Sequence, residues 1–223
     1  MKITAVIPVR IGSQRVINKN LKPFGNTSLL ELKIDNLLKV KGIDEIIVNT
    51  DSDDAIELAK SKGVSFHRRE DYYASSKCTN SEFLEHLGVV TETDIFAYCP
   101  CTTPFILPAT IDEAILKFLN NDNSFDCLAT VSDVKEFLWL DGNPINYERD
   151  KQPNSQNLPN IYALNFGLNL ISRENLIKYK NIVGLNPLFT VTDEIEGLDI
   201  DTPLDFFVAE QIYSKMKEDS TLF

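Results

Sequence analysis

Basic and amide side chains gather in one short loop near the N-terminus, in the segment RIGSQRVINKN. Its candidate phosphate and nucleoside ligands are Arg10, Gly12, Ser13, Arg15, Lys19 and Asn20. The cations could neutralise phosphates, and the asparagine amide could read the edge of a base or a sugar. The glycine would let the backbone approach a phosphate closely, and the serine adds a hydroxyl and a backbone N–H donor. The loop is neither a Walker A motif nor the G-x-G-x-x-G dinucleotide fingerprint, so alone it indicates either an anion site or a solvated polar loop.

Two carboxylates near the C-terminus form a second candidate site, in the segment LDIDTP. Asp199 and Asp201 stand two residues apart at the end of a predicted strand, where both side chains would point to one face. Aligned carboxylates facing a phosphate site would suit Mg²⁺, which takes one or two carboxylates together with phosphate oxygens and water. Asp201 could instead cap the last helix, because Thr202 and Pro203 follow it. Taken with the basic loop, the pair indicates phosphoryl or nucleotidyl chemistry, in which cations and a divalent metal neutralise charge on phosphate oxygens.

Strand and helix patterns alternate through the first half of the chain, which must position these loops. Apolar β-rich runs predict strands over residues 2–9, 44–50, 64–66, 94–99 and 125–132. Helical spacing predicts helices over residues 29–40, 52–62, 79–90 and 108–121. This alternation predicts an α/β fold with right-handed crossovers and a mostly parallel sheet. Ligands of such sheets bind beyond the carboxyl ends of the strands, and the basic loop leaves the first strand at that end.

The middle and the end of the chain follow a different pattern. Between residues 132 and 161 a hairpin turn at Asp141 and Gly142 and a polar loop predict an excursion from the sheet, either an active-site cover or an oligomerisation arm. Strand character returns over residues 161–172. A short strand and a last helix close the chain, with the helix entered through Thr202 and Pro203. Its predicted apolar stripe is Leu204, Val208, Ile212 and Met216.

Composition and charge exclude several classes of protein. With a formal charge of -11 and a pI near 4.7, the chain lacks the basic face that a nucleic-acid partner requires. No apolar stretch approaches the roughly 20 residues of a membrane span, and we expect neither a membrane nor a secretory signal, hence a cytoplasmic, reducing environment. The spacing of Cys78, Cys99, Cys101 and Cys127 matches no paired zinc motif. His67 and His86 are expected to be structural or surface residues.

The segment IPVRIGSQRVINKNLKPFGN resembles the signature of the CMP-sialic acid synthetase (acylneuraminate cytidylyltransferase) family, I-P-A-R-x-G-S-K-x-x-x-x-K-N. The matching residues are Arg10, Gly12, Ser13, Lys19 and Asn20. The blocks IIVNTDSDDAIELAKSKG, RREDYYAS, CTTPFI and LDIDTPLDFFVAEQ agree with the family in order and spacing. The resemblance therefore covers nearly the whole chain, which we expect to be one cytidylyltransferase domain over residues 1–223.

The resemblance implies a three-layer, Rossmann-like nucleotidyltransferase fold with a mostly parallel twisted sheet. It implies an enzyme that couples CTP to the anomeric hydroxyl of a 2-keto-3-deoxy sugar acid, a nonulosonic acid, and releases pyrophosphate. It also implies that residues 132–161 form a protruding arm that joins two copies into a homodimer.

Residue roles follow from the same resemblance. Arg10, Ser13 and Lys19 would contact the triphosphate, with Arg10, Lys19 and Asp201 serving the catalytic step. Asn20 would lie by the nucleoside, and Arg69 would join the nucleotide pocket. Asp199 and Asp201 would carry Mg²⁺.

Several positions depart from the family pattern. Gln14 replaces a lysine, and the neighbouring Arg15 is the candidate substitute for its charge. Cys99 and Ile106 stand where the family often has a glutamine and an arginine near the sugar, so the sugar acid stays open. The form T-x-P-F resembles the branch that handles bacterial nonulosonic acids other than N-acetylneuraminate. The alternatives are a cytidylyltransferase for a Kdo-like acid, which the Lys19–Asn20 pair disfavours, and a non-catalytic nucleotide-sugar-binding homologue.

Overall fold

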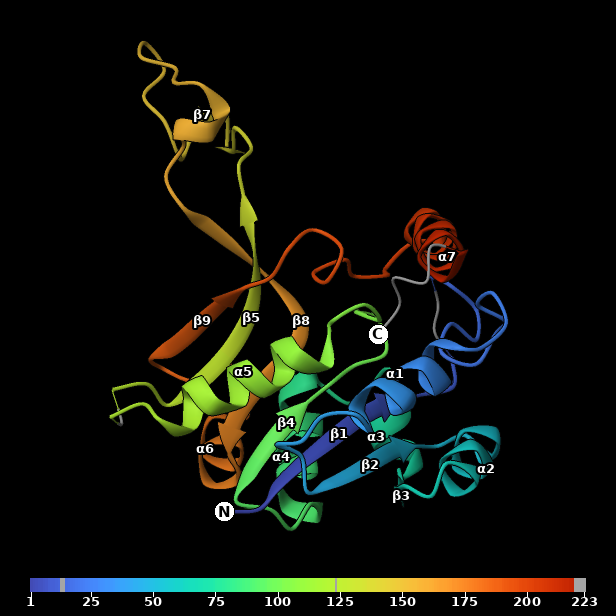
Figure 1. The fold of residues 1–223 in the computed structure, drawn as a ribbon. Coiled ribbons are helices and arrows are strands. Elements are labelled where there is room, and N and C mark those ends of the chain that lie inside the picture. Colours follow the sequence, from blue (N-terminus) through green and yellow to red (C-terminus); the bar gives the residue numbers. More distant parts are fainter. Residues whose placement is uncertain (13–14, 123, 219–223) are drawn as a thin grey trace.

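A seven-stranded sheet forms the centre of the molecule in the computed structural model, which describes residues 1–12, 15–122 and 124–218 (Figure 1). In spatial order its strands are β3 (Ser65–Arg68), β2 (Glu45–Thr50), β1 (Ile3–Val9), β4 (Ile95–Tyr98), β8 (Ile161–Ser172), β5 (Cys127–Val134) and β9 (Pro187–Val191). Only β8 runs antiparallel to its neighbours, β4 and β5, among these described strands. The predicted α/β class with a mostly parallel sheet is confirmed.

Helices cover both faces of the sheet and give three layers. They are α1 (Leu29–Leu37), α2 (Asp53–Ser61), α3 (Asp71–Ala74), α4 (Asn80–Val90), α5 (Pro108–Leu119), α6 (Arg173–Tyr179) and α7 (Pro203–Glu218). Successive residues of β1 belong to different cores. Ala5 lies in the core that contains residues of α1, α2, α5 and α7, whereas Val6 lies in the one that contains residues of α4 and α6. Burial of β1 on both faces explains its nearly continuous apolar sequence.

Local signals in the sequence set several element boundaries. The side chains of Ser28, Ser52 and Thr79 cap α1, α2 and α4, and each accepts a hydrogen bond from a backbone N–H of the first turn. Capping satisfies N–H groups that have no partner within the helix. Asp141 and Gly142 both have positive φ, 49° and 78°, which suits the tight turn between β6 (Trp139–Leu140) and β7 (Asn143–Pro144).

The excursion predicted over residues 132–161 is present as a protruding arm. The β5–β8 ladder continues to the pair Val134 and Ile161, and the chain between them projects away from the helices and the rest of the sheet (Figure 1). It carries the β6–β7 hairpin and a 3-10 turn, Ser155–Asn157. The role of the arm in dimerisation stays a prediction.

The structure corrects two predictions for the C-terminal segment. The segment around Asp199 and Asp201 forms no strand; it is an extended loop that leads from β9 into α7. The predicted stripe of α7 (Leu204, Val208, Ile212, Met216) faces the core only in part, because Ile212 and Met216 pack against it whereas Leu204 and Val208 are exposed. Leu204 is 68% exposed, and the buried residues are Phe206, Ala209 and Tyr213. The ring of Phe24 selects this face, because its centroid lies 5.4 Å from that of Phe206 and 5.2 Å from that of Tyr213.

No helix within the described part of the chain is both long enough and apolar enough to span a bilayer.

Candidate active site

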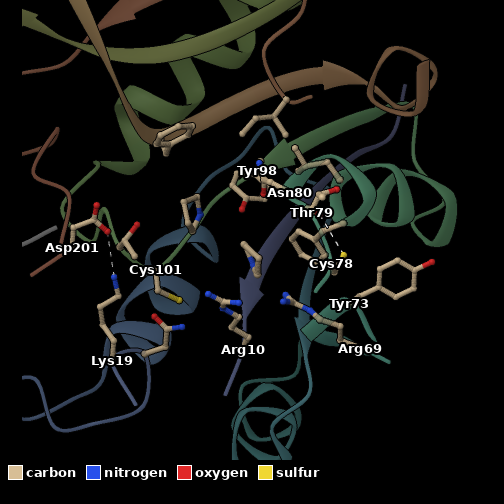
Figure 2. Close-up of a pocket in the computed structure, with 18 of the residues that line it drawn as sticks. Arg10, Lys19, Arg69, Tyr73, Cys78, Thr79, Asn80, Tyr98, Cys101 and Asp201 are labelled. Carbon is tan, nitrogen blue, oxygen red and sulfur yellow. Dashed lines mark hydrogen bonds and ion pairs between the residues drawn. The ribbon is translucent and has the colours of Figure 1, made fainter. Parts of the chain in front are cut away.

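The candidate site is an open cleft of about 750 Å³ at the carboxyl ends of the central strands. From β1 the chain moves outward to β2 and β3, and then returns to place β4 on the other side of β1. The loops after β1 and β4 therefore diverge, which opens a crevice at this switch in strand order. The basic loop, the segment after β3, the loop after β4 and the carboxylate loop all contribute to its walls (Figure 2).

Two arginines line the cleft from the ends of β1 and β3. Arg10 follows β1 and is exposed, whereas Arg69 is only 4% exposed. Figure 2 shows both guanidinium groups directed into the cleft. Burial lowers the pKa of Arg69 to about 10, so this arginine still carries its charge at neutral pH. The predicted nucleotide-pocket residues Arg10 and Arg69 are thus brought together.

Arg69 is held by a residue that the sequence analysis missed. Asn49 Oδ1 accepts a hydrogen bond from Arg69 Nε at 2.6 Å, and Asn49 O accepts one from Arg69 Nη2 at 3.0 Å. The Phe83 ring centroid lies 4.2 Å from Arg69 Cζ, which adds a cation–π contact. These contacts leave other N–H donors of the guanidinium available to a ligand. Asn49 lies in the middle of a strand pattern, so it carried no local signal of this role.

Lys19 links the basic loop to the carboxylate loop. It is 8% exposed, and its Nζ donates a hydrogen bond to the backbone oxygen of Ile200. The same Nζ lies 3.9 Å from Asp201 Oδ1, the pair joined by the dashed line in Figure 2. Burial lowers the pKa of Lys19, and the charges of Asp201 and Asp199 oppose this shift. Arg15 Nη2 also contacts Asp201 Oδ1 at 2.8 Å, so both predicted cations reach the predicted carboxylate.

The two aspartates reach the cleft without the strand that was predicted to align them. A hydrogen bond of 2.8 Å from Ile200 N to Thr102 O fixes the extended loop beside the segment after β4. Asp201 does not cap α7, because Thr202 Oγ1 takes that position and accepts a hydrogen bond from Asp205 N at 3.2 Å. The carboxylate of Asp201 is therefore left to face Lys19 and Arg15.

Asp199 supplies the observation that tests whether the pair fits Mg²⁺. Its Oδ1 is buried and has no hydrogen-bond partner among the described residues. Burial raises the pKa of Asp199, an effect that a hydrogen bond with Thr102 opposes. No cluster of three His, Cys, Asp or Glu side chains that could hold a metal occurs in the described ranges. An unpaired carboxylate oxygen close to Lys19 fits Mg²⁺, which takes one or two carboxylates and completes its coordination with phosphate oxygens and water.

The remaining predicted ligands of the basic loop differ in position. Asn20 lines the cleft, and its buried Oδ1 lacks a partner in the described chain, so this oxygen is available to a hydroxyl or amino group. Gly12 has φ +91°, a conformation that favours glycine, but it is not among the lining residues. Ser13, and Gln14 with it, lie outside the described residues.

One wall of the cleft contains no residue that was predicted for the site. This wall lies between β3 and the start of α4 and consists of Tyr73, Ser75, Cys78, Thr79, Asn80, Phe83 and Leu84. Part of it falls within the block RREDYYAS, which was the available signal.

His86 stacks on Tyr73 with ring centroids 3.6 Å apart, and His67 Nδ1 lies 2.8 Å from Asn49 Nδ2. Both histidines therefore support side chains of the site, in keeping with the structural role expected of them.

The two cysteines that follow β4 are not activated as nucleophiles. Cys99 and Cys101 are buried, and burial raises the pKa of each thiol to about 12. Thiols of such high pKa are poor nucleophiles at neutral pH.

Comparison with known proteins shows which family the chain belongs to. A family model described as cytidylyltransferase matches residues 4–217. The chain belongs to the cytidylyltransferase family. This cytidylyltransferase-family chain is 28% identical to the pseudaminic acid cytidylyltransferase of Campylobacter jejuni serotype O:23/36, over 96% of the chain and 97% of the relative. It is 26% identical to the CMP-N,N'-diacetyllegionaminic acid synthase of Legionella pneumophila, over 98% and 99%.

A longer relative is matched over part of its length. The N-acylneuraminate cytidylyltransferase of Escherichia coli O18:K1:H7 is 28% identical over 96% of the chain, which spans 52% of that relative. Among solved structures, a CMP:2-keto-3-deoxy-manno-octonic acid synthetase complexed with CTP superposes with a TM-score of 0.71 at 16% identity, over 96% of the chain and 99% of that structure. At this identity the likeness concerns the fold, and it confirms the predicted nucleotidyltransferase architecture for this cytidylyltransferase-family chain.

Proposed function

We propose that this protein transfers a cytidylyl group from CTP to a nonulosonic acid, giving the CMP-sugar and pyrophosphate. The observation that carries the proposal is the convergence of Lys19, Arg10 and Arg69 with Asp199 and Asp201 in one cleft. A set of cations facing two carboxylates suits a triphosphate with its divalent metal. The names of the relatives in Campylobacter and Legionella support a nonulosonic acid as the acceptor.

The reaction is a displacement at phosphorus. A hydroxyl oxygen of the sugar acid bonds to the α-phosphorus of CTP, the bond from that phosphorus to the pyrophosphate oxygen breaks, and the hydroxyl proton passes to solvent. Arg10, Arg69 and Lys19 neutralise phosphate charge and hold the nucleotide in line for attack. Asn20 orients the nucleoside through its unpaired Oδ1.

Mg²⁺ is the proposed cofactor. Asp199 and Asp201 would hold it, and when bound it would neutralise charge that develops on the phosphate oxygens. Lys19 keeps Asp201 in place and balances its charge through the 3.9 Å contact.

A pyrophosphate-release assay tests the function. Purified protein is given CTP and Mg²⁺ with N-acetylneuraminic acid, pseudaminic acid, N,N'-diacetyllegionaminic acid or 2-keto-3-deoxy-manno-octonic acid. We expect release with at least one of the first three. Release with the last acid alone would favour the Kdo-like alternative. CTP binding without release for any acid would favour the binding-only homologue.

The proposal includes a homodimer joined through the arm, in the cytoplasm, where CTP is made and thiols stay reduced. Large apolar side chains are exposed on the arm and along the nearby strands, namely Trp139, Leu140, Ile145, Tyr162, Leu164, Phe189 and Val191. Exposed apolar surface of this extent is typical of an interface. We expect a dimer in sedimentation velocity and a shift towards monomer in the double variant Trp139→Glu and Leu140→Glu. A monomeric wild type would contradict the dimer and leave the transferase activity open to its own assay.

A further inference from the structure

Strand β8 carries a bulge where it crosses the candidate site. Its pairing with β5 shifts register between Ala129 and Val131, whose partners on β8 are Asn169 and Leu164. β8 therefore runs through residues 165–168 while β5 advances by the single residue Thr130. Bulges beside active sites often redirect a side chain, so the residues of this one are candidates for a role in the cleft.

Phe166 lies in the bulge with φ +56°. A bulky side chain rarely adopts this left-handed conformation, which persists only where the surroundings enforce it. Here Asn165 enforces it: its Nδ2 donates to Thr192 Oγ1 at 2.9 Å and to Ser132 Oγ at 3.1 Å, and its Oδ1 accepts from Gly167 N at 3.1 Å. The fold thus holds Phe166 in a strained conformation through buried hydrogen bonds.

The strained residue lines the cleft from a strand that lies across β1 from Arg69. Phe166 is half-buried and is one of the residues that line the cleft. Thr103 Oγ1 donates to Asn165 O at 2.7 Å, and the preceding Thr102 holds the carboxylate loop through Ile200. In the sheet, β4 and β8 lie on the opposite side of β1 from β2 and β3, which position Arg69. If the nucleotide binds near β1–β3, as in the proposed function, the part of the cleft beside Phe166 remains for the sugar acid.

Apolar neighbours surround this part of the cleft. Phe166 packs against the core cluster that includes Ile182 and Leu84, and both of these residues also line the cleft. An aromatic ring in such a setting offers a surface for methyl and C–H groups. It offers no partner to a hydroxyl, which would lose hydrogen bonds to water there.

We propose that Phe166 determines which sugar acid is accepted, by forming an apolar wall against which the acyl methyl and ring C–H groups of a nonulosonic acid pack. This inference rests on the proposed function and concerns the acceptor half of the same site. Phe166 selects an acid that carries acylamino groups over one that carries hydroxyls alone.

The variant Phe166→Asn removes the ring and keeps a residue that tolerates positive φ. The ratio of kcat/KM for N,N'-diacetyllegionaminic acid to kcat/KM for 2-keto-3-deoxy-manno-octonic acid is measured for the wild type and the variant, together with the KM for CTP. We expect the ratio to fall by about tenfold, the effect of one lost apolar contact, while the KM for CTP stays unchanged. Phe207→Asn, at an exposed position of α7, is the matched control. Phe166→Gly, which relaxes the backbone, replaces the variant if the asparagine form does not fold.

The outcomes separate the inference from the function. In one outcome the wild type turns over an acid while the folded variant keeps the same ratio of kcat/KM for the two acids. That result would overturn the role of Phe166 and leave the proposed function standing. An equal rise in the KM for CTP and for the acid would also overturn it, because general distortion of the site would then explain the loss. A wild type that prefers 2-keto-3-deoxy-manno-octonic acid would contradict the inference. A wild type that releases no pyrophosphate with any of the four acids would contradict both the inference and the proposed function.

Discussion

Asn49 Oδ1 accepts a hydrogen bond from Arg69 Nε at 2.6 Å, and this contact joins the ends of two neighbouring strands beneath the cleft. Asn49 is 1% exposed, and its other amide atom contacts His67. A buried amide with both ends engaged holds the guanidinium in one orientation before any ligand arrives. The affinity of the cleft for a triphosphate should therefore depend on a residue that does not line it.

The variant Asn49→Leu tests this positioning role. It removes the acceptor of Arg69 Nε and keeps a similar volume, so we expect the KM for CTP to rise by about tenfold, as for a lost hydrogen bond to a charged group. The KM for the sugar acid should change far less. Asn120→Leu, at the exposed end of α5, controls for the substitution itself. An unchanged KM for CTP in the folded variant would show that Phe83 and the backbone are sufficient to hold Arg69.

Lys19→Met should remove turnover without unfolding the protein. The ammonium is buried between two loops and lines the cleft. In the proposed reaction it neutralises phosphate charge, so its loss should lower kcat by at least about 100-fold. Stability should change little, because the variant also removes the desolvation cost of a buried charge, and Arg15 still contacts Asp201. Lys41→Met, on an exposed turn, is the control. A variant with normal kcat would remove Lys19 from the catalytic set.

The predictions that succeeded rest on local patterns. Ser28, Ser52 and Thr79 cap the helices they were expected to begin or precede, because a cap depends on a few adjacent residues. The basic loop was assigned to the site because its position after the first strand determines where it lies in a parallel sheet.

The predictions that failed depend on contacts between distant segments. On α7 two sets of apolar residues share helical spacing, and packing against Phe24 buries Phe206 and Tyr213 while Leu204 stays exposed. Likewise, Asp199 and Asp201 were expected at a strand end, but a loop held by Thr102 delivers them. The bulge at Phe166 left no mark in a sequence that reads as an uninterrupted strand.

The partly buried carboxyl of Asp199 predicts that the free energy of unfolding falls as the pH rises. Its pKa is raised in the folded state, so the folded protein binds the proton more tightly than the unfolded chain, and stability falls as the pH rises through the folded pKa. In EDTA at pH 7, Asp199→Asn should therefore have a higher Tm than the wild type. The difference should shrink as the pH is lowered towards the ordinary pKa of an aspartate. A lower Tm for the variant at pH 7 would contradict this assignment.

The same pair of proteins tests the metal by a route that does not need turnover. With CTP present, Mg²⁺ should raise the Tm of the wild type, because a ligand that binds only the folded state stabilises it. The rise should be smaller in Asp199→Asn. Equal rises in both proteins would place Mg²⁺ on the nucleotide without this carboxylate.

Glu196 should contribute to both stability and turnover. Its Oε2 accepts a hydrogen bond from Leu107 N at 3.0 Å, and its Oε1 accepts one from Thr110 Oγ1 at 3.1 Å. These two hydrogen bonds tie the loop that leads to Asp199 to the start of α5. We expect Glu196→Ala to cost about 1 kcal/mol, a fall in Tm of about 3 °C, and to lower turnover by about tenfold because the carboxylate loop shifts. The exposed Glu194→Ala is the control, and equal behaviour of the two variants would contradict this role.

The accessibility of the cysteine thiols allows ligand binding in the cleft to be measured without a mutation. All four cysteines are described. Cys78 and Cys101 line the cleft, but Cys101 is buried, as are Cys99 and Cys127, so only Cys78 among the four is partly accessible. A thiol reagent applied to the folded wild type should therefore modify one position, at the wall beside Thr79 and Asn80. Occupancy of the nucleotide half can then be followed as protection of Cys78 from alkylation, with no substitution introduced and no knowledge of the sugar acid required.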